Sequence, residues 1–227
     1  MLKKTKLSLV FFLLVNFLSA QDSLLPFWKD IQAFKKHDSI SFPPSHAILF
    51  IGSSSFTRWT DMQNYFPGHT VVNRGFGGSS LPHVIRYVDD IVFPYQPKQV
   101  VIYCGENDFA SADTVTATIV FNRFKQLFQV IRNQLPGIPI AFVSIKPSPS
   151  RERLWPKMVE ANLLIKKFLK KKKATAYIDV YHAMLNKDGT VMKDIFTADN
   201  LHMNAKGYAI WQKVMEPYLL KTNADKN

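Results

Sequence analysis

The chain has 227 residues, of which 47% are hydrophobic and 20% are charged, and its formal net charge is +12. This balance is that of an ordinary globular protein, so it excludes a disordered or low-complexity chain, and no internal repeat is present. The length suits a single domain with a sizeable core.

The first 20 residues have the pattern of a secretory signal peptide. A lysine-rich start precedes an apolar run over residues 7–18, and Ala20 ends a group of small residues suited to cleavage before Gln21. The run is shorter than the ~20 residues that span a bilayer, which disfavours a membrane anchor. The sequence therefore predicts an exported protein, periplasmic or secreted, whose mature chain has no integral membrane span.

The rest of the chain alternates between short apolar runs and longer helical patterns. Residues 21–45 are predicted to form an N-terminal extension, residues 46–221 the main domain and residues 222–227 a C-terminal tail. The predicted strands are Ala47–Ile51, Thr70–Val72, Gln99–Tyr103, Ile138–Ser144 and Ala176–Val180. The predicted helices are Phe56–Tyr65, Leu81–Ile91, Thr114–Gln134, Pro156–Lys172 and Asn204–Leu220, the last with Asn204 as its N-cap.

These strands are apolar along their whole length, as expected for parallel strands that are covered on both faces. Alternating strands and helices of this length predict an α/β fold, a three-layer α/β/α sandwich around a parallel sheet. Ligands of such sheets bind at the carboxyl ends of the strands, so this edge is where chemistry is expected.

Two small-residue motifs follow the first two strands. Residues 51–55 (IGSSS) form a turn that exposes a serine hydroxyl beside unpaired helix amides, although plain N-capping explains a serine there as well. Residues 73–80 (NRGFGGSS) contain glycines that allow a close backbone approach to a ligand, or that serve only a structural turn. Their spacing does not fit a dinucleotide-binding fingerprint.

Two further motifs carry polar side chains. Asn107, in the segment GEND after the third strand, can donate its amide hydrogens to a developing oxyanion, or it can form an Asx turn. Asp199 stands three residues before His202, so its carboxylate can hold Nδ1 of the ring and leave Nε2 free as a base. No set of side chains with metal-ligand spacing accompanies them.

The order of these motifs in the strand–helix series resembles the SGNH hydrolase (GDSL-like lipase/esterase) superfamily over about residues 47–220. The resemblance implies a five-stranded, flavodoxin-like parallel sheet. It implies that Ser54 is the nucleophile, His202 its base and Asp199 the partner of His202. It also implies an oxyanion hole made of the backbone amides of Ser54 and Gly78 and the side chain of Asn107.

One position departs from the family pattern. Ser53 stands where the family more often has Asp, so hydrogen bonding around the nucleophile must differ. Ser53 and Ser55 are alternative nucleophiles, and the spacing from Gly52 favours Ser54. The resemblance implies a serine esterase that works through an acyl-enzyme and requires no metal or organic cofactor.

The substrate is less defined by the sequence. Arg74, Lys146, Arg151 and Trp155 are expected near the cleft, which favours a polar or anionic substrate, although Trp155 can equally be a packing residue. We expect a short acyl (acetyl) ester on a carbohydrate. The alternatives are a lysophospholipase or lipase-like esterase, an acyltransferase that uses the same serine, and a non-catalytic carbohydrate-binding module.

Two remaining features are predicted to have no catalytic role. The lysines within residues 166–173 are interleaved with apolar residues, as on the solvated face of an amphipathic helix. Phe168 is the single aromatic residue among them, so the repeated aromatic interleaving of a nucleic-acid site is absent. Cys104, the single cysteine, excludes an intramolecular disulfide and is predicted to be a buried, inert thiol.

Overall fold

The computed structural model describes residues 25–221, and the chain divides into two compact units, Met1–Ser41 and Phe42–Asn227. The described part of the first unit contains helix α2 (Trp28–Ile40). The predicted signal peptide, residues 1–20, and the predicted tail, residues 222–227, lie outside the described residues and stay predictions.

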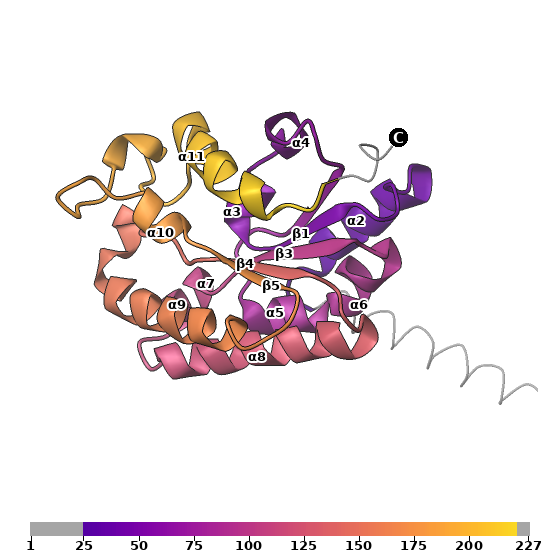
Figure 1. The fold of residues 1–227 in the computed structure, drawn as a ribbon, viewed down its shortest axis with the longest axis horizontal. Helices are drawn as coiled ribbons and strands as arrows, with labels where there is room; N and C mark the ends of the chain where they lie inside the picture. Colours follow the sequence, from indigo (N-terminus) through magenta and orange to yellow (C-terminus); the bar gives the residue numbers. More distant parts are fainter. Residues whose placement is uncertain (1–24, 222–227) are drawn as a thin grey trace, which may run out of the picture. The chain divides into compact units, whose positions relative to one another are not determined.

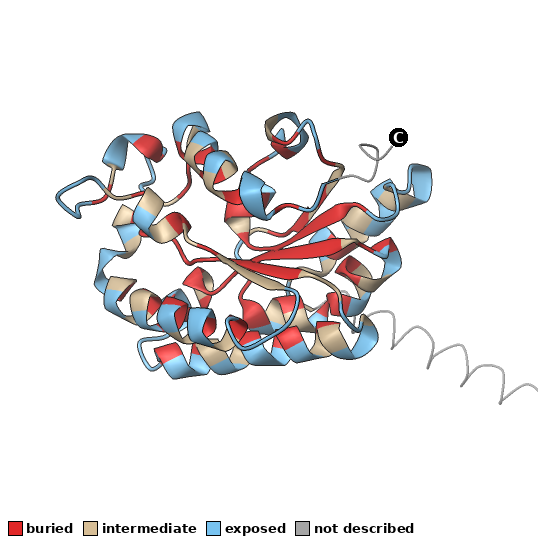
Figure 2. Cartoon of the chain, viewed as in Figure 1, coloured by how far each residue is buried: buried red, intermediate tan, exposed pale blue. Residues whose placement is uncertain are grey.

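The second unit is built on one parallel sheet. Its strands are β1 (Ile48–Gly52), β2 (Val71–Gly75), β3 (Gln99–Tyr103), β4 (Ile140–Val143) and β5 (Thr175–Ile178). They lie in the order β2-β1-β3-β4-β5, and every neighbouring pair is parallel. The predicted five-stranded, flavodoxin-like sheet is therefore confirmed. The three inner strands are buried along their whole length, and exposure begins only at the two edge strands (Figure 2).

The strands are joined by helices of very different lengths. These are α3 (Ser54–Thr57), α4 (Met62–Tyr65), α5 (Leu81–Arg86), α6 (Val88–Ile91), α7 (Glu106–Ser111), α8 (Ala117–Gln134), α9 (Trp155–Leu169), α10 (Val180–Ala183) and α11 (Ala205–Met215). Short 3₁₀ turns lie at η1 (Phe93–Tyr95), η2 (Pro149–Leu154), η3 (Lys193–Ile195) and η4 (Glu216–Tyr218).

Three predicted helices differ from the structure. The helix predicted over residues 56–65 is interrupted between α3 and α4, where the chain turns so that Trp59 is fully buried and stacks on Tyr208, with ring centroids 4.7 Å apart. The helix predicted over residues 81–91 is divided at Tyr87. The last helix ends at Met215, because Pro217 has no amide hydrogen with which to continue it. Asn204 is its N-cap, as predicted.

Helices cover both faces of the sheet, which confirms the three-layer sandwich (Figure 1). On one face α5, α8 and α9 pack together, and Phe124 of α8 meets Phe142 of β4 with ring centroids 4.8 Å apart. On the other face Trp211 of α11 meets Tyr103 of β3, also at 4.8 Å. Burying each such aromatic side chain contributes about 1.5–3 kcal/mol, so both helical layers stabilise the sheet.

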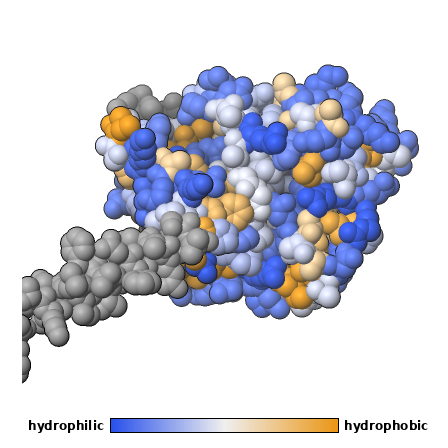
Figure 3. Space-filling model, turned by 180° about the vertical axis from the view of Figure 1, so that it is seen from behind, coloured by the Kyte–Doolittle hydropathy of each residue, from blue (hydrophilic) through white to orange (hydrophobic). Residues whose placement is uncertain are grey.

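The surface is mainly hydrophilic on the face shown in Figure 3, where apolar residues form only scattered patches. The lysines at positions 166, 167 and 170–173 are exposed on and after the last turn of α9, as predicted for a solvated helix face. Among residues 25–221, no helix combines the length and the apolar composition needed to cross a membrane.

Candidate active site

The turn between β1 and α3 exposes one serine of three. Gly52 has a φ of 135°, and a Cβ atom there would lie 1.8 Å from the carbonyl oxygen of Tyr103, so only glycine fits. The amide of Ser53 donates to that same carbonyl at 3.0 Å. Ser53 and Ser55 are 2% and 1% exposed, whereas Ser54 is only half-buried. The turn therefore directs the Ser54 hydroxyl out of the core.

Ser54 meets His202, which lies 148 residues away in the sequence. The distance from Ser54 Oγ to His202 Nε2 is 3.0 Å, and the distance from His202 Nδ1 to Asp199 Oδ2 is 2.6 Å. Because a carboxylate only accepts hydrogen bonds, Nδ1 carries the ring proton and Nε2 accepts from the Ser54 hydroxyl. The structure thus brings Ser54, and neither of its serine neighbours, into a hydrogen-bonded chain with His202 and Asp199.

Asp199 is held by the loop that leads into α11. Its Oδ1 atom accepts from the amides of Leu201 and His202, each at 2.9 Å, and from Thr197 Oγ1 at 2.7 Å. Burial opposes the charged carboxylate, but the hydrogen bonds from His202, Leu201 and Thr197 outweigh it and hold the pKa of Asp199 well below its usual range. Asp199 is therefore an ionised, rigidly placed acceptor for the imidazole ring.

Thr197 was not identified from the sequence. A threonine two residues before an aspartate is a common turn pattern, so the spacing alone does not single it out. Its hydroxyl oxygen also lies 3.1 Å from the carbonyl oxygen of His202, so its one hydrogen is shared between that carbonyl and Asp199, and its amide donates to the same carbonyl at 2.8 Å. Thr197 thus closes the loop around both Asp199 and His202.

The second and third motifs are linked to the turn that carries Ser54. Gly78 has a φ of 82°, and the next residue, Ser79, donates its hydroxyl to the carbonyl of Gly52 at 3.1 Å. Asn107 Nδ2 donates to the carbonyl of Ser79 at 3.0 Å, which occupies one of its two amide hydrogens. Within residues 25–221, the amides of Ser54 and Gly78 donate no hydrogen bond to another protein group. Three donors are therefore available at this edge of the sheet.

The last residue of the third motif has a structural role. Asp108 is fully buried and accepts from the amide of Leu81 at 2.9 Å and from Arg123 Nη1 at 2.8 Å. Burial raises the pKa of the Asp108 carboxyl, although both of these donors oppose the rise. Asp108 thereby ties α7 to the start of α5 and to α8.

Two basic residues expected to face the cleft are buried and paired within the protein, which corrects that prediction. Lys146 is 1% exposed, and its Nζ atom donates to Glu106 Oε2 at 2.6 Å and to Ser148 Oγ at 2.6 Å. Arg74 is 8% exposed, and its Nε atom donates to the hydroxyl of Tyr95 at 2.7 Å. Because a cation strongly prefers burial with a partner to burial alone, both side chains are held by the protein and are not presented to an anionic substrate.

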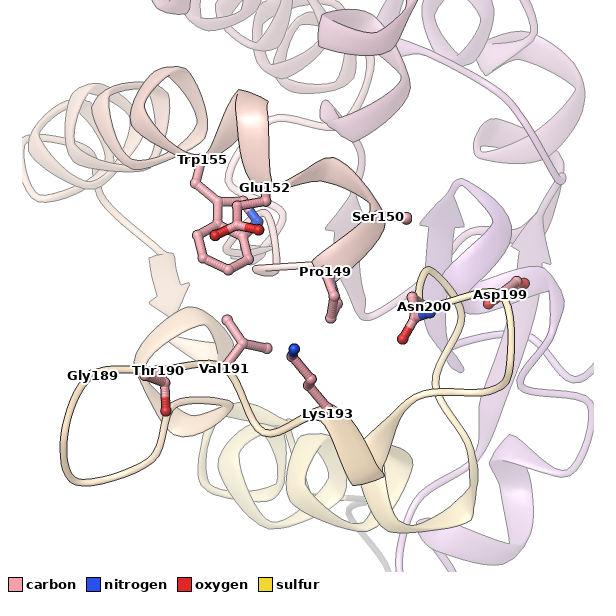
Figure 4. A pocket seen from close by; sticks show the side chains of 10 residues that line it. All are labelled: Pro149, Ser150, Glu152, Trp155, Gly189, Thr190, Val191, Lys193, Asp199 and Asn200. Atoms are coloured by element: carbon pink, nitrogen blue, oxygen red, sulfur yellow. The ribbon is translucent and has the colours of Figure 1, made fainter.

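A pocket of about 560 Å³ adjoins the triad through Asp199 (Figure 4). Glu152 and Trp155 form one wall, and the side chains of Val191 and Lys193 lie across from them, with Asp199 at the far end (Figure 4). Its lining consists of Pro149, Ser150, Glu152, Trp155, Gly189, Thr190, Val191, Lys193, Asp199 and Asn200. Arg151 is not part of the lining.

Trp155 both packs and lines the pocket. Its Nε1 atom donates to the carbonyl of Ser148 at 3.0 Å, which fixes the orientation of the indole ring at the pocket wall. Among residues 25–221, no group of three His, Cys, Asp or Glu residues could hold a metal ion. Cys104 is buried as predicted, and burial raises the pKa of its thiol well above the usual value, which disfavours the thiolate.

Comparison with known proteins agrees with this geometry. A family model described as GDSL-like Lipase/Acylhydrolase family matches residues 38–210, a range that includes Ser54, Gly78, Asn107, Asp199 and His202. No match was found among curated proteins.

Three solved structures illustrate the likeness of the fold. A Streptococcus pneumoniae protein, provisionally assigned as a platelet activating factor, has a TM-score of 0.73 at 22% identity, and the match covers 94% of this chain and 99% of that one. A GDSL-like lipase from Bacteroides thetaiotaomicron has a TM-score of 0.71 at 18% identity, covering 83% and 96%. A catalytic mutant of an acetylxylan esterase from Geobacillus stearothermophilus has a TM-score of 0.61 at 15% identity, covering 77% and 94%.

Proposed function

The chain belongs to the GDSL-like lipase/acylhydrolase family of carboxylic ester hydrolases, and we propose that it cleaves its ester through Ser54, His202 and Asp199. The observation that carries the proposal is the hydrogen-bonded chain from Ser54 Oγ through His202 to Asp199, at 3.0 Å and 2.6 Å. Nucleophile, base and orienting carboxylate each have the partner that acyl transfer requires.

The reaction runs in two steps. His202 Nε2 takes the hydroxyl proton as Ser54 Oγ attacks the ester carbonyl carbon, and Asp199 stabilises the imidazolium that forms. The negative oxygen of the tetrahedral intermediate accepts from the amides of Ser54 and Gly78 and from the free amide hydrogen of Asn107. His202 then protonates the leaving alcohol, and the acyl group stays on Ser54. Water, deprotonated by His202, releases the acid in the second step.

We expect Asn107→Ala to lower kcat by ~10²–10³-fold and to change KM little. The amide acts on the charge that develops in the transition state, and the neutral ester carbonyl gains far less from it. Steady-state kinetics with p-nitrophenyl acetate give both constants. A rise in KM at unchanged kcat would show that Asn107 is not a donor of the oxyanion hole.

For the substrate, we propose a short acyl ester, such as an acetyl ester, on a carbohydrate. The pocket next to Asp199 is open and combines one aromatic wall, Trp155, with the exposed polar groups of Glu152, Thr190 and Lys193. Sugar rings present both apolar faces and hydroxyl groups, so this mixture suits them, whereas a long acyl chain requires a continuous apolar surface. The fold shared with an acetylxylan esterase is compatible with the proposal.

The proposal is tested with p-nitrophenyl acetate, butyrate and octanoate beside an acetylated xylo-oligosaccharide, using wild type and Trp155→Ala. We expect acetate to be the best of the three simple esters. We also expect Trp155→Ala to raise KM for the acetylated sugar several-fold and to leave turnover of p-nitrophenyl acetate nearly unchanged, because the indole face contacts only the sugar.

The other outcomes identify the competing activities. Octanoate as the best ester would indicate a lipase-like enzyme. Transfer of the acetyl group to an added acceptor sugar, in preference to release of acetate, would indicate an acyltransferase. Folded protein that binds the sugar without any turnover would indicate a carbohydrate-binding module.

A further inference from the structure

A buried network of charged and hydroxyl groups lies at the first turn of α7, between β3 and β4. Glu106 Oε2 accepts from Lys146 Nζ at 2.6 Å and from the hydroxyl of Tyr103 at 2.9 Å. Ser148 Oγ accepts from Lys146 Nζ at 2.6 Å and donates to Glu106 Oε1 at 2.5 Å. The side chains of Lys146 and Glu106 are 1% and 5% exposed, so solvent does not replace these bonds.

The network is not needed to explain stability. A buried ion pair is costly to desolvate, and well-packed apolar residues of similar volume are often at least as stable in its place. Such a pair does fix the relative position of the segments that carry it, because its hydrogen bonds form only in a defined geometry.

The segments that it joins all belong to the site. Glu106 directly precedes Asn107 in the first turn of α7, and Gly105, before it, has a φ of 126°, which glycine adopts far more readily than other residues. The backbone carbonyl of Tyr103 accepts the amide of Ser53, next to the nucleophile. The backbone carbonyl of Ser148 accepts Trp155 Nε1 at the pocket wall.

We propose that Lys146 and Ser148 act through Glu106 as positioning residues, which hold the first turn of α7 so that the Asn107 amide faces the oxyanion. The role of Asn107 in the oxyanion hole rests on the proposed function. The position of Asn107 is argued from the hydrogen-bond network alone. A displacement of about 1 Å in a catalytic group can lower a rate by ~10²-fold, so the rate is sensitive to how firmly the first turn of α7 is held.

Direct electrostatic action by Lys146 is a different mechanism with a different signature. The ammonium group directs two of its three hydrogens at Glu106 and Ser148, and its charge is balanced by the carboxylate. If Lys146 acts by holding Glu106, uncharged side chains at positions 106 and 146 that keep the hydrogen bonds of residue 106 should restore much of the kcat. If its positive charge acts on the reaction, removal of both charges should not recover it.

The test compares Lys146→Met, Glu106→Gln and the double variant. Glutamine keeps an acceptor for Tyr103 and gains a donor for Ser148, so the double variant removes both charges without leaving one of them buried alone. We expect Lys146→Met to lower kcat ~10–100-fold with KM changed less than about twofold, and the double variant to lose much less than the product of the two single losses.

A matched control separates positioning from general destabilisation. Leu127 is fully buried on α8, and Leu127→Ala should lower the Tm while leaving the kcat of folded protein unchanged. If Leu127→Ala reduces kcat as much as Lys146→Met at equal loss of Tm, the network is merely structural. A double variant no better than Lys146→Met, or a change confined to KM, would also overturn the proposal.

A readout independent of turnover follows the Asn107 side-chain amide by NMR, assigned with Asn107→Asp. We expect its resonances to shift and broaden in Lys146→Met, to return towards wild type in the double variant and to stay unchanged in Leu127→Ala. Unchanged resonances in Lys146→Met would sink the positioning role even if activity falls. If wild type shows no Ser54-dependent ester hydrolysis, the proposed function fails, while the NMR result still decides whether the network positions Asn107.

Discussion

Ser54→Ala is expected to lower kcat for p-nitrophenyl acetate by about 10⁶-fold, because the acyl-enzyme cannot form without the hydroxyl. The variant should still be faster than the uncatalysed reaction in water, because the oxyanion donors and substrate binding remain. KM should change little, since the side chain lost is small and half-buried. Steady-state kinetics of the purified protein, with a folding check by circular dichroism, measure the effect.

The neighbouring serines provide matched controls. Ser53 and Ser55 differ from Ser54 by one position, yet they are 2% and 1% exposed and neither meets His202. Ser53→Ala and Ser55→Ala should therefore keep most of the activity. If activity survives Ser54→Ala but is lost in one of these variants, the protein is still a serine esterase, and the other serine is its nucleophile.

The second large effect is expected at the base. His202→Ala should lower kcat by about 10⁶-fold, because it removes the base whose Nε2 atom is hydrogen-bonded to the Ser54 hydroxyl. Asp199→Asn should be less damaging, by about 10⁴-fold, since the imidazole remains but loses the carboxylate that holds its Nδ1 proton. The reverse order of the two losses would show that the assignment of base and partner is wrong.

The chain offers a close control for His202. His182 also stands three residues after an aspartate, and its Nδ1 atom lies 2.9 Å from Asp179 Oδ1. Its side chain is 74% exposed, and none of the contacts of the described residues joins it to a serine hydroxyl. His182→Ala should therefore leave kcat unchanged. A loss comparable to that of His202→Ala would mean that the assay reports on folding and not on catalysis.

The comparison of Asp199–His202 with Asp179–His182 shows why local spacing was not enough to predict the site. Both pairs satisfy the same local geometry, in which an aspartate reaches the ring of a histidine three residues later. Only the order of all the motifs along the strand–helix series pointed to His202. Thr197, and the ion pair between Glu106 and Lys146, were not indicated by the order of the motifs. Their roles are seen only in the structure.

The fold class and the candidate residues of the site could be predicted from the sequence. Continuous apolar runs require strands covered on both faces, and Gly52 and Asn204 carry local signals that depend only on backbone sterics and capping. Which serine faces His202 depends on the tertiary structure, since 148 residues separate Ser54 from His202. The tertiary structure also determines that Lys146 and Arg74 are buried with partners. Whether a long basic side chain is buried or exposed depends on which hydrogen-bond acceptors the packed layers bring within its reach.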